Sequence, residues 1–197
     1  MENEQKSSQV SEIIYDLSQK GKDITIADIL GTLKGRGIAL LMAVFSVPAA
    51  MPVPAPILAT ILGIPLVLLT LQLFLGKKSA WLPERIKTKQ VPSDILESAS
   101  KWLKRLEFFL HPRLGFLVNR FMISIFCLIF AIVMMFPVPL TNTVPAFAIL
   151  LIALGLFERD GLFVIGGMFV GSIWCGLLGY ATYVAGDEFV EFIREML

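Results

Sequence analysis

A short polar stretch inside a long apolar run is the part of this sequence best suited to chemistry. Thr141, Asn142 and Thr143 lie between two prolines, Pro139 and Pro145. Each proline lacks a backbone donor and clashes with the preceding helical turn, so a straight helix cannot pass through. In lipid, the freed backbone groups need partners within the protein or in a water-filled cavity. The hydroxyl and amide oxygens beside such a break would suit an ion or a polar substrate.

A second group of residues with chemical capacity is charged and lies beside the apolar runs. Glu158, Arg159 and Asp160 separate two of these runs, and Arg36 and Arg120 each lie close to the start of one. Ionisable side chains at membrane depth are costly and are often functional. Two interpretations stay open. The residues are exposed turns and interfacial anchors, or Glu158 or Asp160 pairs with one of the arginines inside the protein.

Neither group has the pattern of an enzyme site. The sequence has no nucleophile motif, no glycine-rich phosphate loop, no nucleotide fingerprint and no spacing typical of metal ligands. The single histidine, His111, lies beside Pro112 and Arg113, where a structural role is the simpler interpretation. Cys127 and Cys175 lie in apolar runs, which is typical of buried free thiols. We therefore predict no enzymatic activity, no metal, no cofactor and no nucleic-acid partner.

The elements that must position these residues are predicted to be membrane helices, because the chain is too apolar for an ordinary soluble domain. Of its 197 residues, 56% are hydrophobic and 17% are charged, whereas roughly a quarter are charged in soluble domains. Charged side chains are absent from residues 37–76, 121–157 and 161–186. Since a span needs about 20 apolar residues, the runs have room for roughly five crossings, or for fewer crossings plus re-entrant segments.

Charge and hydropathy divide the chain into five parts. Residues 1–36 are expected to hold short amphipathic cytoplasmic helices, and residues 187–197 form an acidic tail. Two membrane segments, 37–76 and 114–186, flank a basic segment at 77–113. Short basic loops stay on the cytoplasmic side, so the basic segment is predicted to lie inside the cell.

Within that basic segment, Ser93 to Leu110 is predicted to form an amphipathic helix. Its apolar residues recur every 3.6 positions, while Lys101, Lys104 and Arg105 occupy the polar side. Such a helix lies among lipid headgroups or packs on the protein's own cytoplasmic face. Both interpretations are open.

The last apolar run carries small residues at every fourth position, namely Gly167, Gly171, Cys175 and Gly179. Small residues at this spacing let two helix backbones approach closely. We expect this seam to pack within one subunit, with a homodimer interface as the alternative.

The proline-rich stretches indicate an internal repeat. Pro48 and Pro54 are six residues apart, as are Pro139 and Pro145, and an alanine follows the second proline of each pair. The expected fold is all-α: two proline-broken hairpins, re-entrant or spanning, a last membrane helix and amphipathic cytoplasmic helices. Paired broken helices often meet at a binding site in repeated membrane proteins, so these prolines would border a substrate or ion path.

Several motifs in this order are similar to those of the bacterial ExoD family. The resemblance covers about residues 25–185 of this chain. It implies a protein of the bacterial inner membrane that is linked to exopolysaccharide production and, in some members, to tolerance of alkaline conditions. It implies no reaction and no catalytic residues. The motifs are Gly35-Arg36-Gly37, the proline stretch 48–56, Gly63-Ile-Pro65, Gln72-Leu-Phe-Leu-Gly76, Trp81-Leu-Pro83, His111-Pro-Arg-Leu114, the stretch 137–145 and Gly155-Leu-Phe-Glu-Arg-Asp-Gly161.

Two functions from different classes follow. In the first, the protein is a small transporter or channel whose path runs past the two proline breaks. In the second, it is a non-transporting membrane partner that assembles or regulates components of polysaccharide synthesis or export. The expected partners are membrane lipid, a second copy of the chain and those components. The sequence favours transport slightly.

Overall fold

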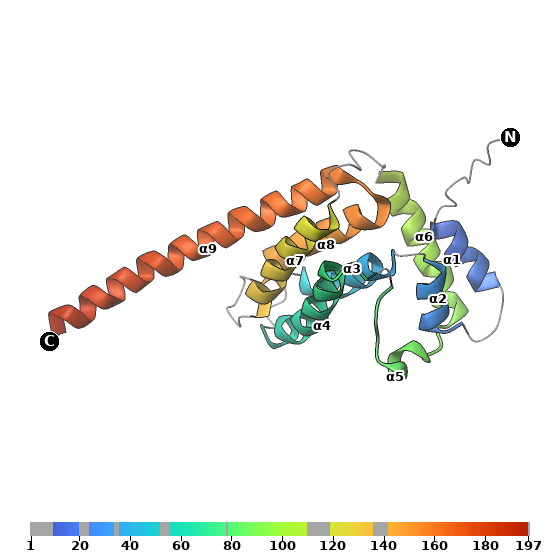
Figure 1. Ribbon diagram of the computed structural model, residues 1–197, viewed down its shortest axis with the longest axis horizontal. Coiled ribbons are helices and arrows are strands. Elements are labelled where there is room, and N and C mark those ends of the chain that lie inside the picture. Colours follow the sequence, from blue (N-terminus) through green and yellow to red (C-terminus); the bar gives the residue numbers. More distant parts are fainter. Residues whose placement is uncertain are drawn as a thin grey trace.

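The fold is built from helices, as the sequence predicts. The computed structural model describes residues 10–19, 24–33, 36–51, 56–77, 79–109, 119–135 and 142–196. In these ranges the only strand-like pairing is one bridge between Thr25 and Gln90. The helices are α1 (Val10–Gln19), α2 (Ile26–Thr32), α3 (Gly37–Ala49), α4 (Pro56–Phe74), α5 (Glu84–Lys87), α6 (Ser93–Phe109), α7 (Arg120–Met135), α8 (Thr143–Glu158) and α9 (Gly161–Met196) (Figure 1).

Four helices, α3, α4, α7 and α8, form a central bundle in which each contacts two others. α3 packs against α4 and α8, and α7 packs against the same two helices. Phe74 at the end of α4 meets Phe121 at the start of α7, with ring centroids 4.9 Å apart. A Cβ on Gly63, earlier in α4, would lie 2.7 Å from Met135 at the end of α7. α4 and α7 are therefore antiparallel.

This direction gives the bundle two different ends. α3 and α7 end, and α4 and α8 begin, at what we call the proline end. At the opposite or charged end lie Arg36, which immediately precedes α3, Arg120, which begins α7, and Asp160, which precedes α9. The contacts also repeat, because the first helix of each pair contacts the second helix of the other pair. α3 touches α8, and α7 touches α4. A duplicated helical hairpin would give such contacts, and the internal repeat stays a prediction.

The bundle is apolar both inside and outside. Its centre is filled by fully buried side chains such as Met42, Phe130 and Ile149. Large exposed apolar surfaces mark contact with a membrane or another protein, and the outer faces of three helices carry such surfaces. Their exposed residues are Ile61, Ile64, Leu68 and Leu71 on α4, Phe121, Met122, Ile129 and Ile132 on α7, and Leu162, Ile165, Phe169, Ile173 and Leu177 on α9.

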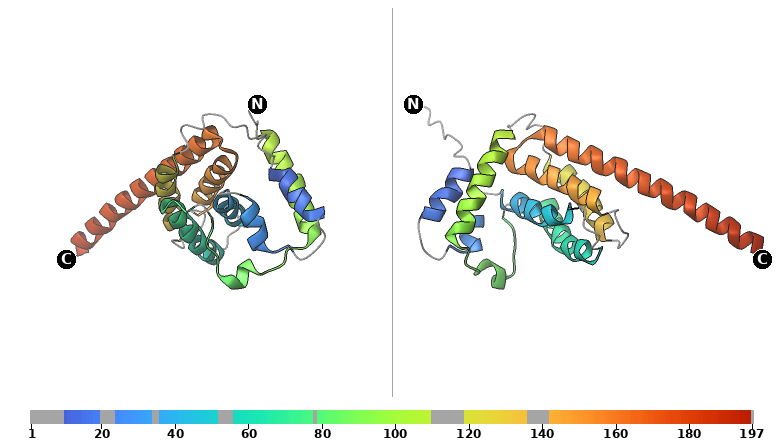
Figure 2. Two further views of the ribbon diagram at one scale, coloured as in Figure 1. Left: turned by 45° about the vertical axis from the view of Figure 1, so that its right-hand side comes forward. Right: turned by 180° about the vertical axis from the view of Figure 1, so that it is seen from behind.

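Helix α9 is the longest element, with 36 residues. Its first part packs along α8 and touches α7, and the rest projects well beyond the bundle (Figures 1 and 2). Its segment 161–186 has a mean hydropathy of 2.0 and is the one helix in the described ranges that is both long and apolar enough to cross a membrane. The apolar helices of the bundle are shorter, so a multi-pass topology stays a prediction.

The remaining helices, α1, α2, α5 and α6, form an N-terminal unit beside the charged end (Figure 1). α1 packs along α6 and buries Ile14 and Leu96 between them. Backbone hydrogen bonds join the start of α2 to the segment before α6, from Ile26 N to the oxygen of Lys89 (3.1 Å) and from Val91 N to the oxygen of Ile24 (2.8 Å). α1 therefore covers part of α6, so this part of α6 packs against another helix of the protein.

Gln72, near the end of α4, ties the bundle to the segment that leads into α5. It accepts a hydrogen bond from the backbone nitrogen of Trp81 and donates one to its carbonyl oxygen at 3.3 Å. The Gln72 side chain is largely buried. It thus satisfies both backbone groups of a residue outside any helix.

Replacing Gln72 with methionine is expected to lower the free energy of unfolding by about 1–3 kcal/mol, because the Trp81 backbone groups lose their partner. Hydrogen exchange at residues 79–83 should speed up as well. Gln90→Met, at an exposed position, serves as the matched control and should change neither quantity. Equal exchange rates in the two variants would contradict the role assigned to Gln72.

Candidate functional site

The residues of the two proline breaks gather at the proline end of the bundle, as far as they are described. Pro54, Pro139 and Thr141 lie outside the described residues. Asn142 immediately precedes α8 and is 6% exposed, and its carbonyl oxygen accepts from Ala146 N at 3.1 Å. Thr143 is the first residue of α8.

The two described prolines mark helix ends instead of interrupting helices. Pro145 is the third residue of α8 and is fully buried, while Pro48 is the penultimate residue of α3. The first turn of a helix tolerates proline because its backbone nitrogens have no partner within the helix. The predicted breaks are thus the boundaries between paired helices, and they bring Pro48 and Pro145 to the same end.

The charged residues between α8 and α9 form a tight turn at the other end. Arg159 is exposed and left-handed, with φ 58° and ψ 34°. Its backbone nitrogen and that of Asp160 both donate to the carbonyl oxygen of Gly155, the latter at 2.8 Å. Asp160 is 2% exposed, and its carboxylate accepts from Leu162 N at 3.0 Å, which caps α9. The described role of Asp160 is therefore structural.

The remaining charged candidates also lie at the charged end. Arg36 is half-buried at the start of α3, and Arg120 is exposed at the start of α7, while Glu158 is half-buried in the last turn of α8. The structure thus brings the charged candidates to one end of the bundle and the proline-flanked polar residues to the other. An internal ion pair among the charged residues stays a prediction.

Polar side chains inside the bundle are hydrogen-bonded within their own helices. Ser46 donates to the carbonyl oxygen of Met42 at 2.7 Å, Thr70 to that of Val67 at 2.9 Å, and Ser124 to that of Phe121 at 2.7 Å. All three hydroxyls are completely buried. Serine and threonine in apolar helices commonly make such bonds, which leave few donors to line a path.

The predicted seam of small residues divides into two halves. A Cβ on Gly167 would lie 2.7 Å from the carbonyl oxygen of Ala148, and one on Gly171 would lie within 2.8 Å of three ring carbons of Phe130. Nothing lies within 4 Å of the corresponding position on Gly179, and Cys175 is half-buried. The first half therefore packs within the subunit.

Gly155 also makes a close contact that sequence reasoning missed. A Cβ there would lie 2.7 Å from the carbonyl oxygen of Asp160 and from Cγ2 of Val164. Gly155 lies four residues before Arg159, and its own carbonyl oxygen accepts the backbone hydrogen bonds that close the turn. Its position is therefore a local signal of this contact. Spacing along α9 alone could not reveal it.

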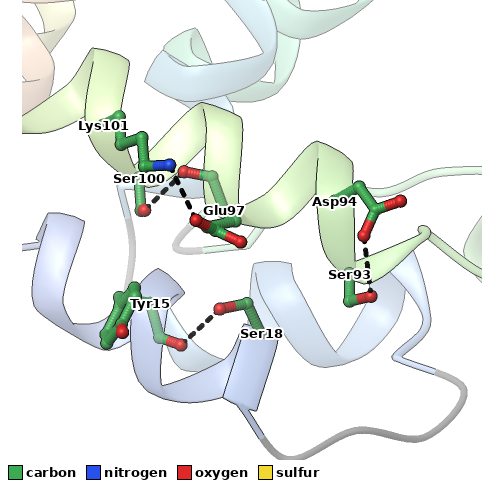
Figure 3. A network of polar contacts seen from close by, with 7 residues as sticks. All are labelled: Tyr15, Ser18, Ser93, Asp94, Glu97, Ser100 and Lys101. Atoms are coloured by element: carbon green, nitrogen blue, oxygen red, sulfur yellow. Dashed lines mark hydrogen bonds and ion pairs between the residues drawn. The ribbon is translucent and has the colours of Figure 1, made fainter.

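A pocket with charged walls lies between α1 and α6, away from the bundle interior. Its volume is about 390 Å³. Lys101 bonds to Glu97 at 2.7 Å on the same helix, and the Glu97 carboxylate raises the pKa of Lys101 (Figure 3). The sequence showed the basic face of α6 but not the acidic helix opposite. The pocket is lined by Ser11, Glu12, Tyr15, Asp16, Ser100, Lys101 and Lys104.

Metal chemistry has no support in the described residues, since no three or more His, Cys, Asp or Glu side chains there gather as a metal site would require. Two places in the described part of the chain are candidates for a small-molecule site. One is the proline end with Asn142, and the other is the pocket between α1 and α6.

Comparisons with known proteins place the chain among relatives of similar length. The family described as "Exopolysaccharide synthesis, ExoD" matches residues 10–180. The protein named ExoD of Rhizobium meliloti (strain 1021) is 32% identical, over 89% of this chain and 78% of its own length. An uncharacterized protein of Synechocystis sp. is 30% identical, over 90% of this chain and 89% of its own length. No solved structure matches the chain.

Proposed function

The chain belongs to the ExoD family, and from this premise we propose that it is an integral protein of the bacterial inner membrane that assembles or regulates the machinery of exopolysaccharide synthesis without transporting a substrate. The family itself is linked to exopolysaccharide synthesis. The observation that carries the non-transporting role is the bundle interior. There, Ser46, Thr70 and Ser124 bond to their own helices, among fully buried apolar side chains.

The distribution of charge supports a membrane orientation. Residues 37–76, 121–157 and 161–186 carry no charge, so the charged side chains that flank them lie at the charged end or beyond residue 186. Arg36, Lys77, Arg120 and Arg159 lie at the charged end, and basic residues favour the cytoplasmic side. The N-terminal unit would then lie in the cytoplasm.

The lengths of three of the four bundle helices support re-entrant hairpins, whereas α4 with 19 residues reaches about 28 Å and nearly matches the hydrocarbon core. At about 1.5 Å per residue, α3 with 13 residues reaches about 20 Å, and α7 and α8 with 16 each reach about 24 Å. The hydrocarbon core is about 30 Å thick. Both hairpins would enter and leave on the cytoplasmic side, while α9 alone crosses and carries the C-terminus outside.

Fusions at the C-terminus test this topology. Alkaline phosphatase joined after residue 197 is expected to be active, because it would lie outside the cytoplasm, and green fluorescent protein at the same place is expected to be dark. The reverse is expected for fusions at the N-terminus. A fluorescent C-terminal fusion would contradict a single crossing by α9.

Affinity purification of the full chain in mild detergent tests the proposed role. We expect a component of polysaccharide synthesis or export to co-purify, and exopolysaccharide yield to fall when that association is lost. Neutralising Lys101, Lys104 and Arg105 together probes the basic face of α6, with Glu84→Gln and Lys87→Met on α5 as the control. If the chain is recovered alone and the exopolysaccharide yield stays normal, the proposal is contradicted.

Transport is the second candidate, and the burial of Asn142 at the proline end favours it. Paired helix ends at one end of a bundle resemble the arrangement of broken helices at transport sites. Purified protein in liposomes distinguishes the two roles. We expect no flux of protons or cations above that of empty liposomes; flux that is abolished by Asn142→Ala would establish transport instead.

A further inference from the structure

The pocket between α1 and α6 has walls of opposite charge. Glu12 and Asp16 lie four residues apart on α1, and Lys101 and Lys104 lie three apart on α6. Residues at these spacings share one helix face. One wall is therefore acidic and the other basic.

The two walls do not neutralise each other directly. Within the described helices, the ion pair that involves these residues is the one from Lys101 to Glu97 on the same helix, at 2.7 Å. No ion pair joins Glu12 or Asp16 to either lysine in that part of the chain. The side chains of Glu12, Asp16 and Lys104 therefore line the pocket without an ion pair in the described residues, while the ammonium group of Lys101 is shared with Glu97, and a ligand with both charges can bridge the two walls.

Two serines also line the pocket. Ser11 and Ser100 are almost completely buried. The hydroxyl of Ser100 donates to the carbonyl oxygen of Glu97 at 2.7 Å, and a hydroxyl that donates keeps lone pairs that accept. Tyr15 of α1 also lines the pocket, and aromatic rings attract ammonium groups.

We propose that this pocket binds a small zwitterion with a phosphate and an ammonium group, the chemistry of an ethanolamine phosphate headgroup. Lys101 and Lys104 would contact the phosphate, and Glu12 and Asp16 the ammonium group. A simple anion would meet two carboxylates, and a simple cation would meet two lysines. The volume of about 390 Å³ lies within the range of roughly 300–1,000 Å³ usual for small-ligand sites.

Calorimetric titration of the full chain in phosphate-free detergent buffer tests the proposal. O-phosphoethanolamine is expected to bind at least about tenfold more tightly than inorganic phosphate or ethanolamine, since only the zwitterion uses both walls. Equal affinity for phosphate, or no binding of any of the three probes, would overturn it. The inference stands apart from the proposed function, because this assay contains no polysaccharide machinery.

Four substitutions at exposed positions separate the two walls. The double variant Lys101→Met and Lys104→Met should lose phosphate and zwitterion binding. The double variant Glu12→Gln and Asp16→Asn should lose the preference for the zwitterion while it keeps phosphate binding. Glu84→Gln with Lys87→Met, which removes the 2.8 Å ion pair on α5, should behave as the unmodified protein. Unchanged affinity in both wall variants would overturn the site.

The source of the ligand is distinguished by a lipid arm. Nanodiscs of phosphatidylethanolamine and of phosphatidylglycerol are compared by native mass spectrometry of the lipid that stays bound. Preferential retention of phosphatidylethanolamine over phosphatidylglycerol, lost in both wall variants, identifies a lipid headgroup as the ligand. Binding of the soluble probe alone identifies a free metabolite of the same chemistry.

Discussion

Replacing Gly171 with alanine is expected to destabilise the contact between α9 and α7. The new Cβ would lie within 2.8 Å of three ring carbons of Phe130. Phe130 is itself almost completely buried, so its ring cannot move aside without repacking the bundle. Overpacking of this kind typically costs about 1–3 kcal/mol, and we expect a loss at the upper end of that range.

Gly179→Ala is the matched control on the same helix. Nothing lies within 4 Å of its Cβ position, and alanine is favoured over glycine in a helix by about 1 kcal/mol. The two substitutions, eight residues apart on one helix, should therefore have opposite effects. Phe130→Leu combined with Gly171→Ala should recover part of the loss, because the smaller side chain makes room.

Reactivity of Cys127 provides the measurement. This thiol is completely buried beside Phe130 on α7, so a thiol-reactive dye reports unfolding of the bundle. Cys175 is half-buried and is replaced by serine in every variant to remove its background signal. An equal melting temperature for the Gly171→Ala and Gly179→Ala proteins would show that the close approach of α9 to α7 is not formed.

The sequence predicted the helices because their signals are local. Ser93 to Leu110 was expected to be helical from its 3.6-residue stripe, and α6 spans Ser93–Phe109. The effect of Pro48 and Pro145 was foreseen less well. Proline is accepted in the first turn of a helix, which accounts for Pro145 in α8, whereas Pro48 lies in the last turn of α3 and Pro65 lies inside α4. The expected breaks became helix boundaries.

What covers each helix could not be predicted, because that depends on residues far apart in the chain. Gly171 and Gly179 fit the same spacing equally well, yet only Gly171 meets a ring from α7. The acidic wall of the pocket is about 85 residues from the basic wall, as Asp16 and Lys101 show. Periodicity identifies the face of a helix that is buried but not the helix that buries it.

The structure also changes the interpretation of the candidate site. Thr141, Asn142 and Thr143 were predicted to supply oxygens to one path, and Asn142 is indeed buried at the proline end. The hydroxyls deeper in the bundle bond to the backbones of their own helices, as serine and threonine in apolar helices commonly do. An apolar run predicts that its residues are buried. It does not predict which group a buried hydroxyl bonds to, because that depends on the rotamer and on packing.

Replacing Asp160 with alanine is expected to have the second large effect, at the turn between α8 and α9. The carboxylate accepts a hydrogen bond from Leu162 N at 3.0 Å and is 2% exposed. Loss of an N-terminal cap costs about 0.5–2 kcal/mol, and the missing carboxylate removes the acceptor of the Leu162 backbone nitrogen. A negative charge at this position also interacts favourably with the helix dipole. We expect a lower melting temperature and a smaller fraction of α9 in its membrane position.

Asp160→Asn separates the hydrogen bond from the charge. Its amide oxygen can still accept from Leu162 N, so this variant should lose less stability than Asp160→Ala. Asp94→Ala, at the exposed start of α6, is the control for removing an acid from a helix N-terminus. The C-terminal alkaline phosphatase fusion reports the position of α9, and the dye reports the bundle. If Asp160→Ala matched Asp94→Ala in both readouts, the cap would contribute nothing to joining the long helix to the hairpins.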